Sequence, residues 1–156
     1  MPEWISKDIV SFAVFAGFVV AAAVFGGQWG AGPWYNTLAK PGWTPPNWLF
    51  PIAWTILYLM IAIAGWLIWV TPHEKRSLLL AIWAGQLLLN GAWSYIFFGR
   101  KEIAFALVDI AGLWLLIAAF TVLAWDVSQR ASLLFVPYLV WVSYAAALNA
   151  SIWVRN

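Results

Sequence analysis

The stretch WYNTLAKPGWTPPNWLFPIAWTILY, residues 34–58, lies between two strongly hydrophobic segments and decides how the chain is arranged. Pro41, Pro45 and Pro46 lack backbone N–H donors and favour extended geometry in the residues before them, which predicts a stiff, non-helical connector over Lys40–Pro46. The tryptophan and tyrosine side chains combine apolar rings with polar edges, a combination typical of the boundary between lipid and water. The stretch is therefore predicted to be an ordered lid on one membrane surface that leads into a helix at about Asn47.

The composition requires lipid as the solvent. Of the 156 residues, 65% are hydrophobic and 9% are charged, whereas soluble chains carry about 25% charged residues. The net charge of +2 comes without an Arg/Lys-rich stripe, so nucleic acid is not a predicted partner. The chain has no cysteine, which excludes disulfides, thiolate catalysis and cysteine-ligated metals.

Charged and turn residues divide the chain into five apolar segments of 18 to 24 residues. About 20 residues of helix cross the hydrocarbon core, and the absence of water there requires helical backbone hydrogen bonding. The predicted fold is all-α: one integral membrane domain, residues 1–156, formed by a bundle of five transmembrane helices with an ordered lid loop over residues 27–47. The five segments are residues 9–26, 48–70, 78–98, 103–125 and 131–154.

The first segment supports two interpretations. Lys7, the apolar run and the alanines at residues 21–23 resemble a secretory signal with a small-residue cleavage site. As a transmembrane helix, the same segment carries Ala13, Gly17 and Ala21 at four-residue steps, a stripe that is predicted to let another helix approach closely.

Unusual residues gather in the lid-side half of the predicted bundle. At a rise of about 1.5 Å per residue, Trp54 and Asp109 lie roughly 9 Å from the lid-side ends of their helices, Asn90 about 12 Å and Asn149 about 8 Å. Trp141 is near the middle of the membrane. This arrangement predicts a mostly apolar pocket under the lid, with a few polar groups to orient a flat hydrophobic ligand.

Several of these residues also have purely structural interpretations. The two asparagines could hydrogen-bond neighbouring helices. The deepest tryptophans are equally suited to core packing and to stacking on a ligand. These four tryptophans are Trp54, Trp83, Trp114 and Trp141.

Conventional catalytic machinery is sparse. His73 is the only histidine and is predicted on the surface opposite the lid, which argues against a Ser/His/Asp triad and against a metal centre. Asp109 is an intramembrane carboxyl group and raises the hypothesis of a proton- or ion-coupled transporter. Its place near a helix N-terminus, where negative charge is favoured, gives it an equally good structural explanation.

A face of small residues on the third segment predicts a homodimer. Ala81, Gly85 and Ala92 lie about 140° around the helix from Asn90. Small residues allow close contact between helices in lipid, while Asn90 points inward.

The motifs WYNTLAKPGWTPP, PIAWTILY, QLLLNGAWSYIFFG, ALVD and VPYLVWVSYAAALN, in this order, resemble the tryptophan-rich sensory protein/translocator protein (TspO, peripheral benzodiazepine receptor) family. The resemblance covers nearly the whole chain. It implies a five-helix membrane bundle, usually dimeric and here bacterial, that needs no cofactor and binds porphyrins such as protoporphyrin IX. Members also bind isoquinoline carboxamides and benzodiazepines.

The resemblance also implies site residues. The ligand-contacting positions of the family correspond to Tyr35, Trp54, Asn90, Trp141 and Ala145. Some bacterial members are proposed to degrade porphyrin in light, and the tryptophans implicated correspond to Trp54 and Trp141, which are candidate catalytic residues. Animal members bind cholesterol through a motif with Tyr after the asparagine that corresponds to Asn149; here that residue is Ala150, which disfavours a specific sterol role.

The resemblance and the residues leave three functions in competition. A membrane receptor or carrier for porphyrins, linked to tetrapyrrole or stress signalling, is the leading hypothesis. The others are the light-dependent porphyrin-degrading enzyme and the coupled transporter.

Overall fold

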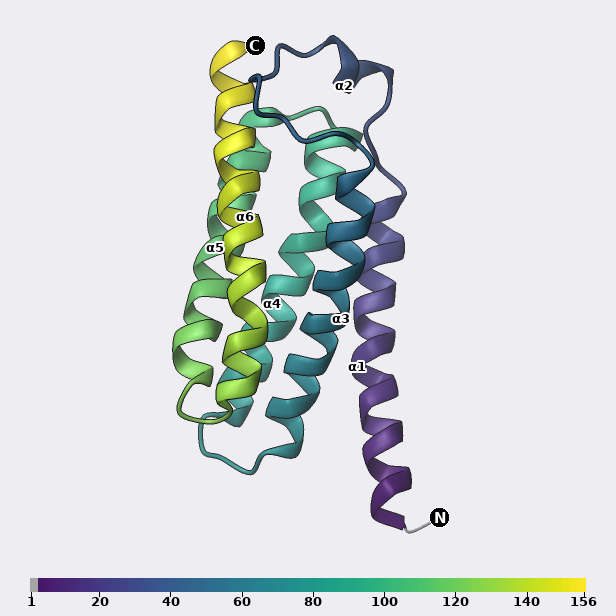
Figure 1. Ribbon diagram of the computed structural model, residues 1–156, viewed down its shortest axis with the longest axis vertical. Helices are drawn as coiled ribbons and strands as arrows, with labels where there is room; N and C mark the ends of the chain where they lie inside the picture. The colour runs from purple at the N-terminus through teal and green to yellow at the C-terminus, as the bar shows by residue number, and fades with distance from the viewer. Residues whose placement is uncertain (1–2) are drawn as a thin grey trace.

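The computed structural model describes residues 3–156, and this part of the chain contains helices and no strand (Figure 1). Five of the helices are long and apolar enough to cross a membrane, which confirms the predicted all-α transmembrane bundle. The elements are α1 (Glu3–Gly27), α2 (Pro33–Thr37), α3 (Leu49–Val70), α4 (Arg76–Ser94), the π-helical turn η1 (Tyr95–Gly99), α5 (Ile103–Ala124) and α6 (Gln129–Arg155).

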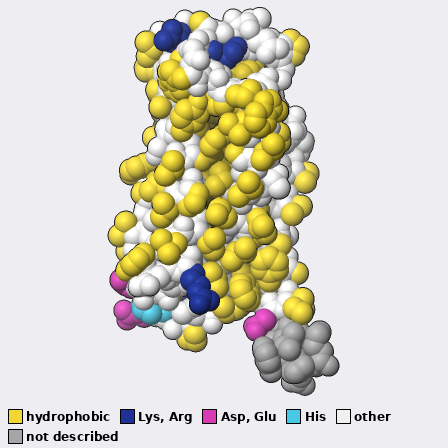
Figure 2. Space-filling view, viewed as in Figure 1, with side chains coloured by type: hydrophobic (Ala, Val, Ile, Leu, Met, Phe, Trp, Pro, Cys, Tyr) yellow, Lys and Arg dark blue, Asp and Glu magenta, His cyan; other side chains and the backbone are white. Residues whose placement is uncertain are grey.

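The long helices pack side by side, with the segment between α1 and α3 lying across one end (Figure 1). Helix α5 packs against α4 and α6, while α1 packs against α3 and α4. Hydrophobic side chains cover the middle of the visible surface, and the Lys and Arg side chains seen there lie at its two ends (Figure 2). Large outward-facing side chains such as Leu88, Val108 and Val154 are 71–79% exposed within the protomer. An exposed apolar surface of this extent indicates contact with a membrane.

The lid has more structure than the sequence predicted. The connector over Lys40–Pro46 is non-helical, and helix α3 begins at Leu49 after a short turn. The five-residue helix α2 was missed. It begins at Pro33, whose fixed φ and missing N–H suit the first position of a helix.

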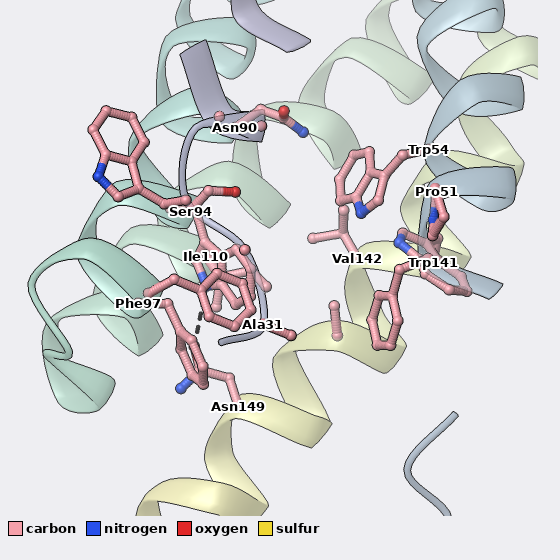
Figure 3. A pocket seen from close by; sticks show the side chains of 18 of the residues that line it. Ala31, Pro51, Trp54, Asn90, Ser94, Phe97, Ile110, Trp141, Val142 and Asn149 are labelled. Carbon is pink, nitrogen blue, oxygen red and sulfur yellow. Dashed lines mark hydrogen bonds between the residues drawn. The ribbon is translucent and has the colours of Figure 1, made fainter. Parts of the chain in front are cut away.

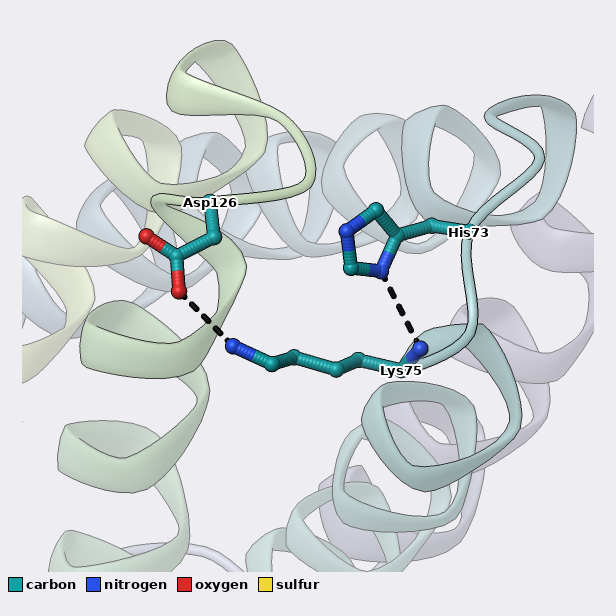
Figure 4. Close-up of polar contacts among 3 residues, drawn as sticks. All are labelled: His73, Lys75 and Asp126. Carbon is teal, nitrogen blue, oxygen red and sulfur yellow. Dashed lines mark hydrogen bonds and ion pairs between the residues drawn. The ribbon is translucent and has the colours of Figure 1, made fainter.

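The end of the bundle opposite the lid carries a small polar cluster (Figure 4). Lys75 Nζ lies 2.7 Å from Asp126 Oδ2 and joins the α3–α4 connector to the α5–α6 connector. His73 lies on the same connector as Lys75, and its Nδ1 accepts a hydrogen bond from the Lys75 backbone N–H at 3.1 Å. His73 is therefore far from the lid.

The small-residue stripe on α1 faces away from the other helices of this chain, so close approach by another helix at this stripe stays a prediction. Ala13, Gly17 and Ala21 are exposed, and a Cβ atom added to Gly17 would meet nothing within 4 Å. Helix α1 instead packs through larger side chains, including the buried Phe15 and Val19. Nothing is described of the side chains of residues 1–7, so the Lys7 feature of the signal-peptide interpretation lies outside the described part.

Candidate functional site

A cavity of about 500 Å³ lies beneath the lid (Figure 3). Side chains from all five long helices, from η1 and from the lid line it. The five residues predicted as ligand contacts are all among them: Tyr35, Trp54, Asn90, Trp141 and Ala145. The structure therefore brings together residues as far apart in the chain as Tyr35 and Ala145, which are 110 positions from each other.

Aromatic rings form much of the wall. Trp54 of α3 and Trp141 of α6 lie on one side of the cavity, and Phe97 of η1 lies on the other (Figure 3). The indole N–H groups of Trp83 and Trp114 donate hydrogen bonds to Ile61 O and Ser143 Oγ. Within the described residues, the indole N–H groups of Trp54 and Trp141 have no such acceptor, so both can donate to a ligand.

The π-helical turn η1 shapes the opposite wall. The wider turn is closed by a hydrogen bond of 2.8 Å from Arg100 N to Tyr95 O. Phe97 stacks on Trp93 with ring centroids 5.0 Å apart and an interplanar angle of 22°. Isolated π-helical turns are frequent at functional sites, because the extra residue per turn redirects side chains.

The floor of the cavity is a chain of hydrogen bonds among buried polar side chains. The Tyr58 hydroxyl donates to Asn90 Oδ1, Asn90 Nδ2 donates to the Tyr138 oxygen, and the Tyr138 hydroxyl donates to Gln86 Oε1, each at 2.8 Å. Tyr58 and Asn90 line the cavity, whereas Tyr138 and Gln86 are fully buried behind them. We name this set of four residues the floor relay.

Asn149 has a structural role as well as a place in the cavity wall. Its Oδ1 accepts a hydrogen bond of 3.1 Å from Trp93 Nε1, and its Nδ2 donates to Ile103 O at 3.0 Å. The side chain therefore joins α6 to α4 and to the start of α5. This outcome favours the helix-bridging interpretation of Asn149.

The lid is held over the cavity by its own contacts. Tyr35 of α2 is buried, and its ring meets those of Phe97 and Phe98 at centroid distances of 6.2 and 5.5 Å. Lys40 Nζ donates to Tyr35 O at 2.6 Å and lies 4.7 Å from the centroid of the Tyr35 ring. Burial, with a smaller contribution from Tyr144, raises the pKa of Tyr35 above its ordinary value. Tyr35 is therefore a neutral roof for the cavity at physiological pH.

Helix α6 also holds the lid in place. The Tyr144 hydroxyl donates to Trp43 O at 2.6 Å, and the Tyr144 and Trp43 rings lie 5.5 Å apart. Nearer the end of α6, the Asn156 side chain bonds to the backbone of Ala39. Trp43 and Trp48 remain 48% and 65% exposed, as expected for the lid's outer surface.

Three residues singled out from the sequence lie outside the cavity. Trp83 is buried in the core, and Trp114 donates to Ser143, so core packing and helix bridging are their roles. The carboxyl group of Asp109 does not line the cavity, and its buried Oδ2 has no hydrogen-bond partner in the described chain. The transporter hypothesis based on Asp109 thus stays a prediction. Trp93, which does line the cavity, was missed.

The cavity lining contains no charged residue within the part of the chain that the structure describes. Its polar groups are amides, hydroxyls and indole N–H groups set among aromatic and aliphatic side chains. Such a site favours an apolar ligand with a few hydrogen-bonding groups. A ligand carboxylate would be poorly solvated deep in this cavity, because it would lose water without gaining a counter-charge.

The fold and site define an integral membrane protein with a lidded ligand cavity. Comparison with known protein families matches residues 9–154 to the TspO/MBR family. The chain is 41% identical to Protein CrtK of Rhodobacter capsulatus, an alignment covering 94% of this chain and 95% of that protein. It is 42% identical to the tryptophan-rich protein TspO of Chlorobaculum tepidum, with 97% and 99% covered. Identity to the human translocator protein is 34%, with 99% and 92% covered. The chain belongs to the TspO/MBR family.

Proposed function

We propose that this protein binds porphyrins, with protoporphyrin IX as the reference ligand, and related flat hydrophobic molecules beneath the lid. Binding would serve a receptor or carrier role linked to tetrapyrrole or stress signalling. The sensory and translocator names of relatives agree with a role of this kind.

The observation that carries the proposal is the position of Trp54 and Trp141. Both indoles line one cavity, and both retain a free N–H within the described residues. A macrocycle there gains aromatic contacts worth about 0.5–1.5 kcal/mol each beyond burial. The cavity of about 500 Å³ falls within the range of ligand sites. With no cation in its lining, the apolar part of a porphyrin suits the interior and the carboxylates suit the mouth.

The same observation supports a second candidate function, the light-dependent degradation of porphyrin. An indole beside a bound macrocycle is readily oxidised, so either tryptophan could be the redox partner of a photoexcited ligand. No other residue is assigned to catalysis.

Titration of the purified protein with protoporphyrin IX, followed by tryptophan fluorescence quenching, tests binding. We expect saturable binding, which Trp54→Phe or Trp141→Phe weakens by about tenfold or less because a π face remains. Failure to saturate would contradict the proposal.

Illumination of the same complexes separates the two functions. A receptor leaves the porphyrin spectrum unchanged. An enzyme consumes porphyrin in light, and the rate collapses in the two Phe variants while quenching still reports bound ligand. Degradation at the wild-type rate in the double Phe variant would remove the chemical basis of the enzyme.

A further inference from the structure

The floor relay connects the cavity to the interior of the bundle. It runs from Tyr58 on α3 through Asn90 on α4 to Tyr138 on α6 and back to Gln86 on α4. Its inner members, Tyr138 and Gln86, are fully buried and do not line the cavity. They therefore influence a ligand only through the two outer residues.

The three hydrogen bonds can all reverse their direction while the four side chains keep their positions. Hydroxyl groups both donate and accept, and a carboxamide exchanges donor for acceptor when it turns over. With both amides turned, Gln86 donates to Tyr138, Tyr138 donates to Asn90, and Asn90 donates to the Tyr58 oxygen. In that direction the O–H of Tyr58 is free to donate into the cavity.

The inner end of the relay does not fix the direction. Gln86 Nε2 is buried and has no hydrogen-bond partner within the described residues. A fully paired amide would lose a bond on turning over, and an unpaired buried group is costly. When the Gln86 amide turns over, its unpaired atom changes from Nε2 to Oε1, so the number of unpaired groups stays the same. The direction of the relay therefore depends on the hydrogen-bond partners available to Tyr58 at the outer end.

We infer that the floor relay makes the cavity favour flat ligands that present a carbonyl-type acceptor to Tyr58. Such a ligand receives the Tyr58 O–H while the relay runs outward from Gln86. A ligand without an acceptor leaves the relay in the inward direction seen here. Gln86 and Tyr138 are then positioning residues for selectivity. This inference rests on the proposed binding of flat ligands in this cavity, and it adds the chemical class that the floor prefers.

The acceptor preference is measured with 9-fluorenone and fluorene, two rigid flat molecules that differ by one carbonyl oxygen. The readout is the ratio of their dissociation constants in each variant. In Gln86→Leu, the side chain at position 86 cannot accept a hydrogen bond from the Tyr138 hydroxyl. Tyr138 therefore donates to Asn90, and the relay takes the outward direction. We expect the preference for fluorenone to rise about threefold to tenfold.

Two further variants separate the relay from simple packing. Tyr58→Phe removes the terminal hydroxyl, so its ratio should fall below that of the wild type and no longer respond to Gln86→Leu. Tyr138→Phe breaks the relay in the middle, so Gln86→Leu should have no effect on the ratio in that background. Ser132→Ala is the matched control, because Ser132 is buried and bonds to Thr121 O, outside the relay. If Gln86→Leu changes both affinities equally or changes neither, the inference is wrong.

Protoporphyrin IX titration of each variant keeps this test distinct from that of the proposed function. Intact porphyrin binding with an unresponsive ratio rejects the relay alone. A responsive ratio without porphyrin binding supports the relay and rejects the porphyrin proposal. If Gln86→Leu does not fold, Gln86→Met provides the same loss of a strong acceptor with a more flexible side chain, and an unchanged ratio there would overturn the inference.

Discussion

The Asn156 side chain forms a pair of hydrogen bonds with the backbone of Ala39 in the lid. Ala39 N donates to Asn156 Oδ1 at 3.0 Å, and Asn156 Nδ2 donates to Ala39 O at 3.1 Å. This pairing fixes the lid to the C-terminal end of α6. In Figure 1 the lid crosses the top of the bundle, with α1 at one side and the end of α6 at the other. A polar contact thus helps to hold the lid over the cavity.

Substitution of Asn156→Ala is expected to accelerate ligand dissociation by about fivefold or more, since it removes two bonds that each contribute about 0.5–1.5 kcal/mol. Stopped-flow recovery of tryptophan fluorescence after displacement measures the rate. Asn36→Ala is the control, because Asn36 is an exposed lid residue whose side chain makes no hydrogen bond within the described chain. Equal rates in the two variants would show that Asn156 does not restrain the lid.

Gly65 on α3 allows three helices to approach. A Cβ atom there would lie 2.6 Å from the Trp83 ring and 2.8 Å from the Phe15 ring, and Trp83 is held by its bond to Ile61 O. Gly65→Ala is expected to destabilise the protein by about 1–3 kcal/mol through overpacking. Thermal unfolding in detergent measures the change. Gly17→Ala, which meets nothing within 4 Å, should be neutral or slightly stabilising; a similar loss in both variants would contradict the packing explanation.

Much of the fold follows from the sequence because lipid restricts the possible structures. The length of each apolar segment and the need for satisfied backbone groups predicted five spanning helices. Helix rise then placed Trp54, Asn90 and Asn149 at similar depths on three different helices, with Trp141 deeper on the same side. The cavity could be anticipated for this reason, without knowledge of which helices are neighbours.

Other features depend on packing that periodicity does not reveal. The direction of each tryptophan is one example: Trp83 points into the core and Trp93 into the cavity wall, although both are on α4. The π-helical turn at residues 95–99 shifts the helical phase locally, so regular 100° spacing misplaces the side chains near it. The floor relay combines residues from three helices, and its inner member Tyr138 gave no signal that distinguished it from other core aromatics.

The predicted homodimer is testable because the chain has no natural cysteine. Ala81 is exposed, whereas a Cβ atom on Gly85 would lie 3.3 Å from Leu116 of α5 in the same chain. Ala81→Cys is therefore the better probe of this face, and we expect it to form a disulfide-linked dimer in membranes under mild oxidation. Val108→Cys, 71% exposed on α5, is the control. Efficient cross-linking of the control alone would place the interface elsewhere.

The ion pair at the other end of the bundle predicts a pH dependence. The hydrogen bond and charge of Lys75 lower the pKa of Asp126 below its ordinary value of 3.8. The stabilisation is therefore fully present above that value and is lost as the pH falls through the lower pKa of the folded state. Both groups are solvent-accessible, so the effect is small.

Thermal midpoints of the wild type and Asp126→Asn should differ slightly at pH 7 and converge at strongly acidic pH. In a Lys75→Gln background the same substitution should have no effect at pH 7. A difference that persists in acid would assign the stabilisation to something other than the ion pair.

The cavity itself is tested most directly by filling it. Ala145 lines the cavity beside Trp141, and an indole at this position would occupy the space proposed for the macrocycle. Ala104→Trp is the matched control, because Ala104 is exposed on α5 and lies outside the cavity. Titration of both folded variants with protoporphyrin IX should show wild-type affinity in Ala104→Trp and at least about tenfold weaker binding in Ala145→Trp, a difference of about 1.4 kcal/mol. Wild-type binding by Ala145→Trp would contradict the claim that porphyrin occupies the cavity beneath the lid.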